Sequence, residues 1–194
     1  MSSSLAMIVL LGCTSGSSSV PEHPGPQATE EPLSWPVDEK GPFNVGYQTW
    51  EHTYRLSEAL GERSIRIHLW YPTSEISGPA GEYTVGTDPS VIAEAAAESP
   101  VHMEGYPVHV HSHGDLDVGT ASAFLSRYLS SHGWVSVAMD HTGNTLLDLT
   151  ADPQSANFFH RPLDVGAALD ALETVDFLRG SVNTQQSILS GHSR

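Results

Sequence analysis

The residues best suited to chemistry stand at the end of the sequence. Ile188 and Leu189 lead through Ser190 into Gly191-His192-Ser193. A short apolar strand that ends in Gly-x-Ser is typical of the sharp strand-to-helix turn that exposes a nucleophilic serine above a sheet. A serine hydroxyl attacks well only when a neighbouring base takes its proton. We therefore expect Ser193 to be the nucleophile of a hydrolase, although the tripeptide alone would equally describe an ordinary loop serine.

A second group of side chains suggests an alternative chemistry. His109, His111 and His113 alternate, so they would share one face of a strand, and Asp115 follows them. Imidazole and carboxylate ligands at this spacing could hold zinc. The run His-x-His-x-Asp also matches most of the metallo-β-lactamase signature, with Leu116 in place of its last histidine. The alternative hypothesis is thus a zinc-dependent hydrolase. The serine hydrolase hypothesis needs no metal or cofactor.

The first half of the sequence favours β-structure. Tyr47, Thr49 and Trp50 favour one strand, and residues 65–71 alternate apolar and polar side chains before Pro72, which predicts a second strand. We expect the turn between them at residues 59–63. In the stretch that follows, an Ala run after an early proline predicts a short helix at residues 89–98.

The second half alternates apolar strands with helical patterns. We expect strands at residues 107–111, 134–139 and 186–190. A helix is expected at residues 120–132, with Ala121, Phe124, Leu125 and Tyr128 on its apolar face. A polar loop at 145–160 should precede a second helix at residues 161–179, which has Pro162 in its first turn and Val165, Leu169, Leu172 and Val175 as its apolar stripe.

This order of elements predicts an α/β fold. Strands joined by helices form a mostly parallel sheet with right-handed crossovers. The β-rich first half would add antiparallel strands at the start of the sheet, and helices would cover both faces.

Three blocks of sequence together resemble the α/β-hydrolase fold, and more narrowly the bacterial platelet-activating-factor acetylhydrolase and dienelactone-hydrolase-like esterases. The first block is the strand that ends in Ser112-His113-Gly114. The second runs from residue 128 to 145 and contains Asp140-His141-Thr142-Gly143. The third begins at Arg161-Pro162-Leu163-Asp164 and ends at Gly191-His192-Ser193. The resemblance extends over residues 41–194.

The resemblance implies a carboxylic-ester hydrolase acting on short-acyl or phospholipid-type esters. Ser193 would attack the ester, and the backbone N–H groups of Arg194 and Asp115 would form the oxyanion hole. Gly114 would permit the tight loop that this hole requires. Asp115 departs from the small or apolar residue usual at that place, and its charge could repel an oxyanion unless the side chain turns away.

In this fold the acid and the histidine of the catalytic triad follow the serine. No residue after Arg194 is present to supply them. The expectation is therefore an incomplete hydrolase domain at residues 42–194, which would show no esterase activity when expressed alone. A third hypothesis is a non-catalytic, surface-anchored lipoprotein domain.

Composition and the N-terminus limit the partners. Eight Lys and Arg stand against 23 Asp and Glu, which gives a formal net charge of -15 and leaves no basic surface for nucleic acid or anionic lipid. Residues 1–13 resemble a bacterial lipoprotein signal that ends at Cys13, the residue that would be lipidated. Residues 14–41 have the composition of a flexible Ser/Gly/Pro linker. We expect a protein of the bacterial cell envelope or a secreted one, held to a membrane only through Cys13.

Overall fold

The computed structural model describes residues 36–74, 80–83, 87–92, 105–148 and 154–193. These residues belong to one unit, Trp35–Arg194. The predicted signal at 1–13, with Cys13, and the linker up to residue 35 lie outside the described residues.

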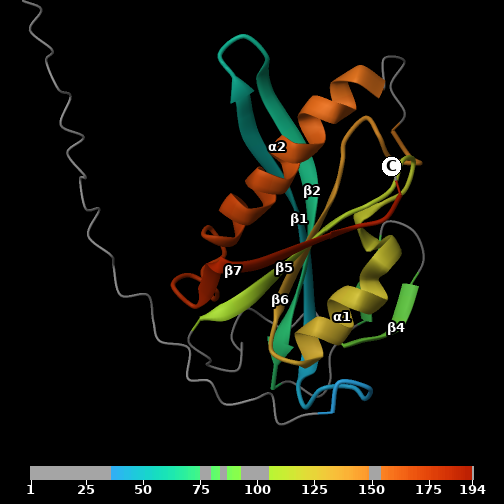
Figure 1. Ribbon diagram of the computed structural model, residues 1–194, viewed down its shortest axis with the longest axis vertical. Coiled ribbons are helices and arrows are strands. Elements are labelled where there is room, and N and C mark those ends of the chain that lie inside the picture. Colours follow the sequence, from blue (N-terminus) through green and yellow to red (C-terminus); the bar gives the residue numbers. More distant parts are fainter. Residues whose placement is uncertain (1–35, 75–79, 84–86, 93–104, 149–153, 194) are drawn as a thin grey trace, which may run out of the picture. The chain divides into compact units, whose positions relative to one another are not determined.

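A five-stranded mixed sheet forms the centre of this unit (Figure 1). Its spatial order is β1-β2-β6-β5-β7. The first two strands form an antiparallel hairpin, β2 pairs antiparallel with β6, and the pairs β6–β5 and β5–β7 are parallel. The predicted sheet, with antiparallel strands at its start, is confirmed. The strands are β1 (Asn44–Ser57), β2 (Gly61–Thr73), β5 (Tyr106–Ser112), β6 (Val135–Asp140) and β7 (Val182–Gly191).

A separate two-stranded antiparallel sheet follows the hairpin. It consists of β3 (Ala80–Glu82) and β4 (Thr87–Ile92). The helix predicted at residues 89–98 is therefore wrong for residues 89–92, because the β-branched Val91 and Ile92 continue a strand. The Ala run that favoured a helix lies outside the described residues.

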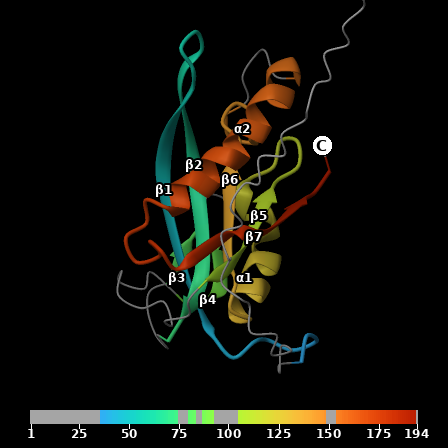
Figure 2. The ribbon, with the colours of Figure 1, turned by 60° about the vertical axis from the view of Figure 1, so that its left-hand side comes forward.

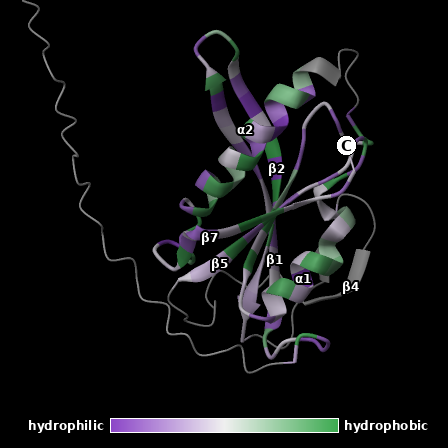
Figure 3. Cartoon of the chain, in the orientation of Figure 1, coloured by the Kyte–Doolittle hydropathy of each residue, from purple (hydrophilic) through white to green (hydrophobic). Residues whose placement is uncertain are grey.

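Side chains alternate between two faces of the central sheet, and each face has its own helix. Residues such as Ile67, Leu69 and Val137 pack against α2 (Gln154–Leu172) in the larger apolar cluster. Their neighbours Trp70 and Ala138 pack on the other face, against α1 (Ala123–Ser131). The middle of the sheet is accordingly hydrophobic (Figure 3), and Figure 2 shows α2 crossing the β1–β2 side of the sheet. The prediction of helices on both faces is confirmed.

The helix predicted at residues 120–132 has a different buried face from the one expected. It begins as a 3-10 turn, η1 (Gly119–Ser122), and continues as α1. Phe124, which was assigned to the apolar face, is 67% exposed. The buried side chains of α1 are instead Ala123, Ser126, Ser130 and Ser131. Small side chains let the helix approach a sheet face already filled by bulky aromatic rings, those of Tyr47 and Trp70.

The second helix starts and ends earlier than predicted. It begins at Gln154, inside the expected loop, and ends at Leu172. Pro162 therefore lies inside the helix, where its exposed ring faces away from the sheet and its missing N–H removes one hydrogen bond. The predicted stripe does pack on the core: Leu172 is buried, and Val165, Leu169 and Val175 are partly buried. Within the described ranges no helix is both long and apolar enough to cross a bilayer.

The packing of α1 gives a first prediction. Substitution Ser126→Leu should lower the free energy of unfolding by about 1–3 kcal/mol, because added methylenes overfill a close-packed contact. The control Phe124→Ala should change it by less than about 0.5 kcal/mol, as expected of an exposed side chain. Urea unfolding followed by circular dichroism measures both. A larger loss in the control would mean that Phe124 does belong to the buried face.

Candidate active site

Ser193 lies just beyond the end of β7, in the conformation expected of a nucleophile at a sharp turn. Its backbone φ is 54°, in the left-handed region. That region costs an ordinary L-residue about 1–2 kcal/mol, so it is populated only where the surrounding structure imposes it. Arg194, the predicted second donor of the oxyanion hole, lies outside the described residues.

The loop after β5 approaches this turn closely. A Cβ atom on Gly114 would lie 2.9 Å from the carbonyl oxygen of His192 and 3.3 Å from Cβ of Ser193. The His192 N–H also donates a hydrogen bond to the carbonyl oxygen of Ser112, at 3.4 Å. The predicted Ser-His-Gly loop and the predicted nucleophile, separated by about eighty residues of sequence, therefore lie against each other, and only glycine fits between them.

The same loop contains a second left-handed residue. Leu116 has a φ of 58°, and within the described ranges it and Ser193 are the two non-glycine residues with positive φ. Asp117, one residue further, forms a parallel bridge with Thr145 in the loop after β6. Backbone strain tends to gather at functional sites, where other contacts hold it in place.

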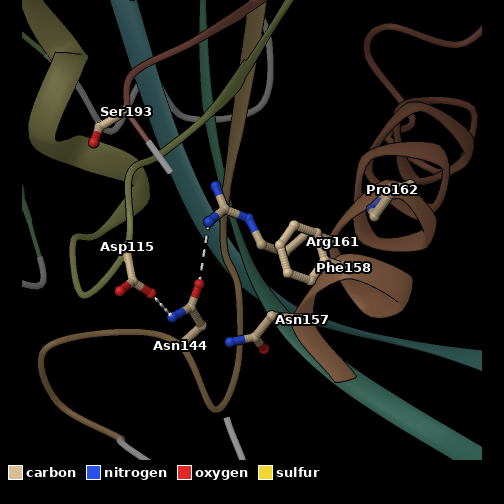
Figure 4. A pocket seen from close by; sticks show the side chains of 7 residues that line it. All are labelled: Asp115, Asn144, Asn157, Phe158, Arg161, Pro162 and Ser193. Atoms are coloured by element: carbon tan, nitrogen blue, oxygen red, sulfur yellow. Dashed lines mark hydrogen bonds between the residues drawn. The ribbon is translucent and has the colours of Figure 1, made fainter. Parts of the chain in front are cut away.

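A cavity of about 290 Å³ lies between these segments (Figure 4). Asp115 and Ser193, both predicted site residues, contribute to its wall. Sequence reasoning gave no role to the other lining residues, although Asn144 and Arg161 belong to the blocks that carry the family resemblance. The remaining lining residues are Asn144, Asn157, Phe158, Arg161 and Pro162.

The carboxylate of Asp115 points to Asn144, and in the view of Figure 4 Ser193 lies on the other side of the Asp115 backbone. Asn144 Nδ2 donates a hydrogen bond to Asp115 Oδ1 at 2.5 Å. Arg161 Nη1 donates to Asn144 Oδ1 at 3.1 Å. The acidic side chain that sequence analysis identified as unusual is therefore turned away and held by an amide.

The four residues of the zinc hypothesis do not converge. His109 hydrogen-bonds Ser190 Oγ at 2.7 Å and Ser136 Oγ at 3.2 Å, and His111 hydrogen-bonds the same Ser190 oxygen at 2.9 Å. Asp115 is engaged by Asn144, as described above. Among the described residues no three His, Cys, Asp or Glu side chains are placed to hold a metal ion. These contacts lend the zinc hypothesis no support, because His109 and His111 bond Ser190 and Asp115 lies beyond the strand on Asn144.

His113 is held in one tautomer by backbone groups. Its Nε2 accepts a hydrogen bond from the backbone N–H of His141 at 3.0 Å, so Nε2 carries no proton. Its Nδ1 therefore donates to the carbonyl oxygen of Gly114, at 2.6 Å. Burial, with a smaller contribution from His141, lowers the pKa of His113 to about 4. These contacts give His113 a structural role in the turn after β5.

A fully buried carboxylate, Asp164, does not line the cavity and was not predicted. It accepts two hydrogen bonds from Arg63, at 2.7 and 2.9 Å, one from Tyr54 at 2.7 Å and one from His141 Nδ1 at 2.8 Å. Burial by itself raises the pKa of Asp164, but the hydrogen bonds from Arg63, His141 and Tyr54 outweigh it and hold the pKa below its ordinary value.

Ser112, His141 and Asp164 are linked in the order of a Ser-His-acid triad. Ser112 Oγ lies 2.8 Å from His141 Nε2, but Ser112 is not among the residues that line the cavity. Arg161 Nη2 donates to the same hydroxyl at 3.1 Å. Because Ser112 does not line the cavity and its hydroxyl is engaged by Arg161, we interpret these three side chains as support for Arg161.

Comparison with solved structures places this arrangement in a known fold. Ferulic acid esterase from Streptomyces cinnamoneus is similar over 83% of this chain and 54% of that chain, with 21% identity and a TM-score of 0.62. The chain has the α/β-hydrolase fold. It spans about half the length of that esterase.

Two further structures overlap more loosely. An acetyl xylan esterase from Paenibacillus sp. R4 has 16% identity and a TM-score of 0.38, with 80% of this chain and 48% of that chain covered. Acetyl xylan esterase 1 from Thermoanaerobacterium sp. JW/SL YS485 has 15% identity and a TM-score of 0.41, with 80% and 47% covered. No protein-family model and no curated protein matches the sequence.

The buried carboxylate gives a second prediction. Substitution Asp164→Asn should lower the free energy of unfolding by about 3–5 kcal/mol, because it leaves the Arg63 guanidinium buried without its counter-charge. The matched control Asp176→Asn removes an exposed ion pair with Arg179 and should cost less than about 1 kcal/mol. Urea unfolding at pH 7 measures both. Equal losses would show that Asp164 contributes no more than a surface charge.

The lowered pKa of His113 gives a third prediction. The unfolded chain takes up a proton at this histidine as the pH falls through about 6.5, whereas the folded chain stays neutral down to about 4. Stability should therefore decrease as the pH falls from 6.5 toward 4.5. His113→Gln, which cannot be protonated, should reduce that slope when the urea midpoint is measured across this range. An unchanged slope would contradict the assignment.

Proposed function

We propose that the whole protein to which this chain belongs is a carboxylic-ester hydrolase with Ser193 as nucleophile. The Ser193 hydroxyl attacks the ester carbonyl carbon, and its proton passes to a base. This attack turns the ester carbonyl into a tetrahedral oxyanion. The backbone N–H groups of Asp115 and Arg194 stabilise this oxyanion. The alcohol then leaves with a proton, and water hydrolyses the acyl-serine to release the acid.

One observation carries this proposal. Ser193 stands in a strained, left-handed turn at the end of a parallel strand, and the Ser-His-Gly loop lies directly against it. An ordinary loop serine needs neither the strain nor the glycine contact. The esterase neighbour supports the fold on which such a turn occurs, and Ser193 faces a cavity in which an acyl group could lie.

The described residues supply no general base to Ser193. Among the described residues no histidine nitrogen forms a hydrogen bond with the Ser193 hydroxyl, and a serine without a base is a poor nucleophile. The expectation that the 194-residue chain alone is inactive therefore stays a prediction. If no serine of the whole protein reacts in the experiment below, the result favours the hypothesis of a non-catalytic surface protein.

The cavity favours a small, uncharged acyl group. Its volume of about 290 Å³ lies at the low end of ligand pockets, and Phe158 and Pro162 give it apolar walls. Both Nη atoms of Arg161 donate to protein groups, and Asp115 brings a negative charge to the wall, which disfavours an anionic substrate. This supports the short-acyl esters expected from the family resemblance. The platelet-activating-factor subtype and the lipid anchor at Cys13 remain proposals from the sequence.

A fourth prediction tests the nucleophile. A fluorophosphonate probe should label Ser193 in the product of the whole gene, as located by mass spectrometry of peptides. Ser193→Ala should abolish the label and slow p-nitrophenyl acetate hydrolysis by at least about a thousandfold. The matched control Ser187→Ala changes an exposed serine of β7 and should keep both.

The 194-residue chain alone should remain unlabelled and should not hydrolyse p-nitrophenyl acetate. Labelling of a different serine, or hydrolysis that survives Ser193→Ala, would refute the assignment of the nucleophile. An unreactive whole protein would favour the non-catalytic surface domain.

A further inference from the structure

We propose that Asn144 and Arg161 are positioning residues that hold the Asp115 carboxylate away from the oxyanion, so that an acidic residue can serve as an oxyanion-hole donor. The inference rests on the proposed function, because it assigns these two residues to the hydrolysis at Ser193. Neither residue would touch the reacting atoms.

The need for such a device follows from charge. The oxyanion is negative, and a carboxylate on the residue that supplies its N–H donor lies close enough to oppose the reaction. A free Asp115 side chain would rotate among staggered conformers and would not be confined to the one that faces Asn144. The hydrogen bond from Asn144 selects a conformer that faces Asn144 instead, and Figure 4 shows the carboxylate in that position.

Arg161 determines which way the Asn144 amide points. A guanidinium only donates hydrogen bonds, so the atom of Asn144 that faces Arg161 must be the acceptor Oδ1. The other atom of the amide, the donor Nδ2, is then directed at Asp115. Asn144 is 1% exposed, so its amide is enclosed by protein, whereas the Asp115 side chain that it holds lies at the surface. If the amide were reversed, its oxygen would face a carboxylate and both contacts would be repulsive.

Arg161 is itself fixed by the loop that carries Asp115. Its Nη2 donates to the carbonyl oxygen of His113 and to Ser112 Oγ. Because Ser112 Oγ accepts from Arg161, its own proton is free to go to His141 Nε2, and His141 Nδ1 donates to Asp164. The orientation of the Asp115 carboxylate is thus set through a continuous series of donors and acceptors that ends on a buried charge.

The backbone of the oxyanion loop has contacts of its own besides the bond from Arg161 to the His113 carbonyl. Leu116 adopts its left-handed conformation, and Asp117 is bridged to Thr145, beside Asn144. Loss of the Asn144 amide should therefore release the Asp115 side chain more than it disturbs the path of the loop. This separation makes the proposal testable by rescue.

The fifth prediction concerns catalysis by the product of the whole gene. In Asn144→Ala, kcat for p-nitrophenyl acetate should fall about a hundredfold while KM changes by less than about threefold, since the released carboxylate opposes the transition state and not binding. Adding Asp115→Ala to Asn144→Ala should recover at least about tenfold in kcat. A merely structural role for Asn144 predicts the reverse: a double variant no faster than the single one.

A second measurement does not depend on activity. Hydrogen exchange of the peptide that spans residues 112–117, followed by mass spectrometry in the 194-residue chain, should become at least about tenfold faster in Arg161→Ala. It should become faster by a smaller factor in Asn144→Ala. The matched control Arg179→Ala removes an exposed arginine distant in sequence from the loop and should leave this exchange unchanged. Asn144→Ser, which keeps a donor, replaces Asn144→Ala if that variant fails to fold.

The outcomes separate the two proposals. Absence of Ser193-dependent hydrolysis in the whole protein overturns the proposed function, and the exchange measurement then decides the positioning role alone. Unchanged exchange in both Arg161→Ala and Asn144→Ala overturns the positioning role even if Ser193 is the nucleophile. Hydrolysis that depends on Ser193, with no recovery in the double variant, overturns the electrostatic part of the inference.

Discussion

The buried carboxylate of Asp164 joins α2 to three other segments of the chain. Its hydrogen-bond donors come from β1 through Tyr54, from β2 through Arg63 and from the loop after β6 through His141. A charge in a dry interior is tolerated only when such partners surround it. The contact therefore fixes the position of α2 on its sheet face, and α2 carries Arg161 into the cavity.

The geometry around Ser193 depends on this contact although Asp164 does not line the cavity. A series of hydrogen-bonded groups leads from Asp164 toward the cavity, and each group orients the next. The series consists of the His141 ring, the Ser112 hydroxyl, the Arg161 guanidinium and the Asn144 amide. At each step of this series a donor meets an acceptor on the next group, which limits the cost of enclosing these polar side chains. A site built this way is rigid where the chemistry requires it, and the strained turns at Leu116 and Ser193 are held in place by their surroundings.

The sequence predicted the central strands and the turn at Ser193 because both have local signals: apolar residues that alternate with polar ones or follow one another, and a Gly-x-Ser ending. It failed on α1, since hydropathy ranks Phe124 above Ala123 although only the smaller side chain packs with Trp70. It placed the start of α2 too late because Pro162 resembles a first-turn residue. The hydrogen bonds of Asp164 and Asn144 had no local signal, because pairing between residues 17 to 110 positions apart leaves no pattern along the chain.

The separation between Asp164 and its partners also constrains how the protein is made. Tyr54 precedes Asp164 by 110 residues and Arg63 precedes it by 101. While the ribosome synthesises the chain, the β1–β2 hairpin emerges long before α2, and Arg63 has no carboxylate from that helix to pair with. Until α2 arrives, this guanidinium must stay in water, so the hairpin cannot settle on the core face in its final form. Docking of the hairpin and assembly of the cavity are thereby linked to one event, the emergence of α2.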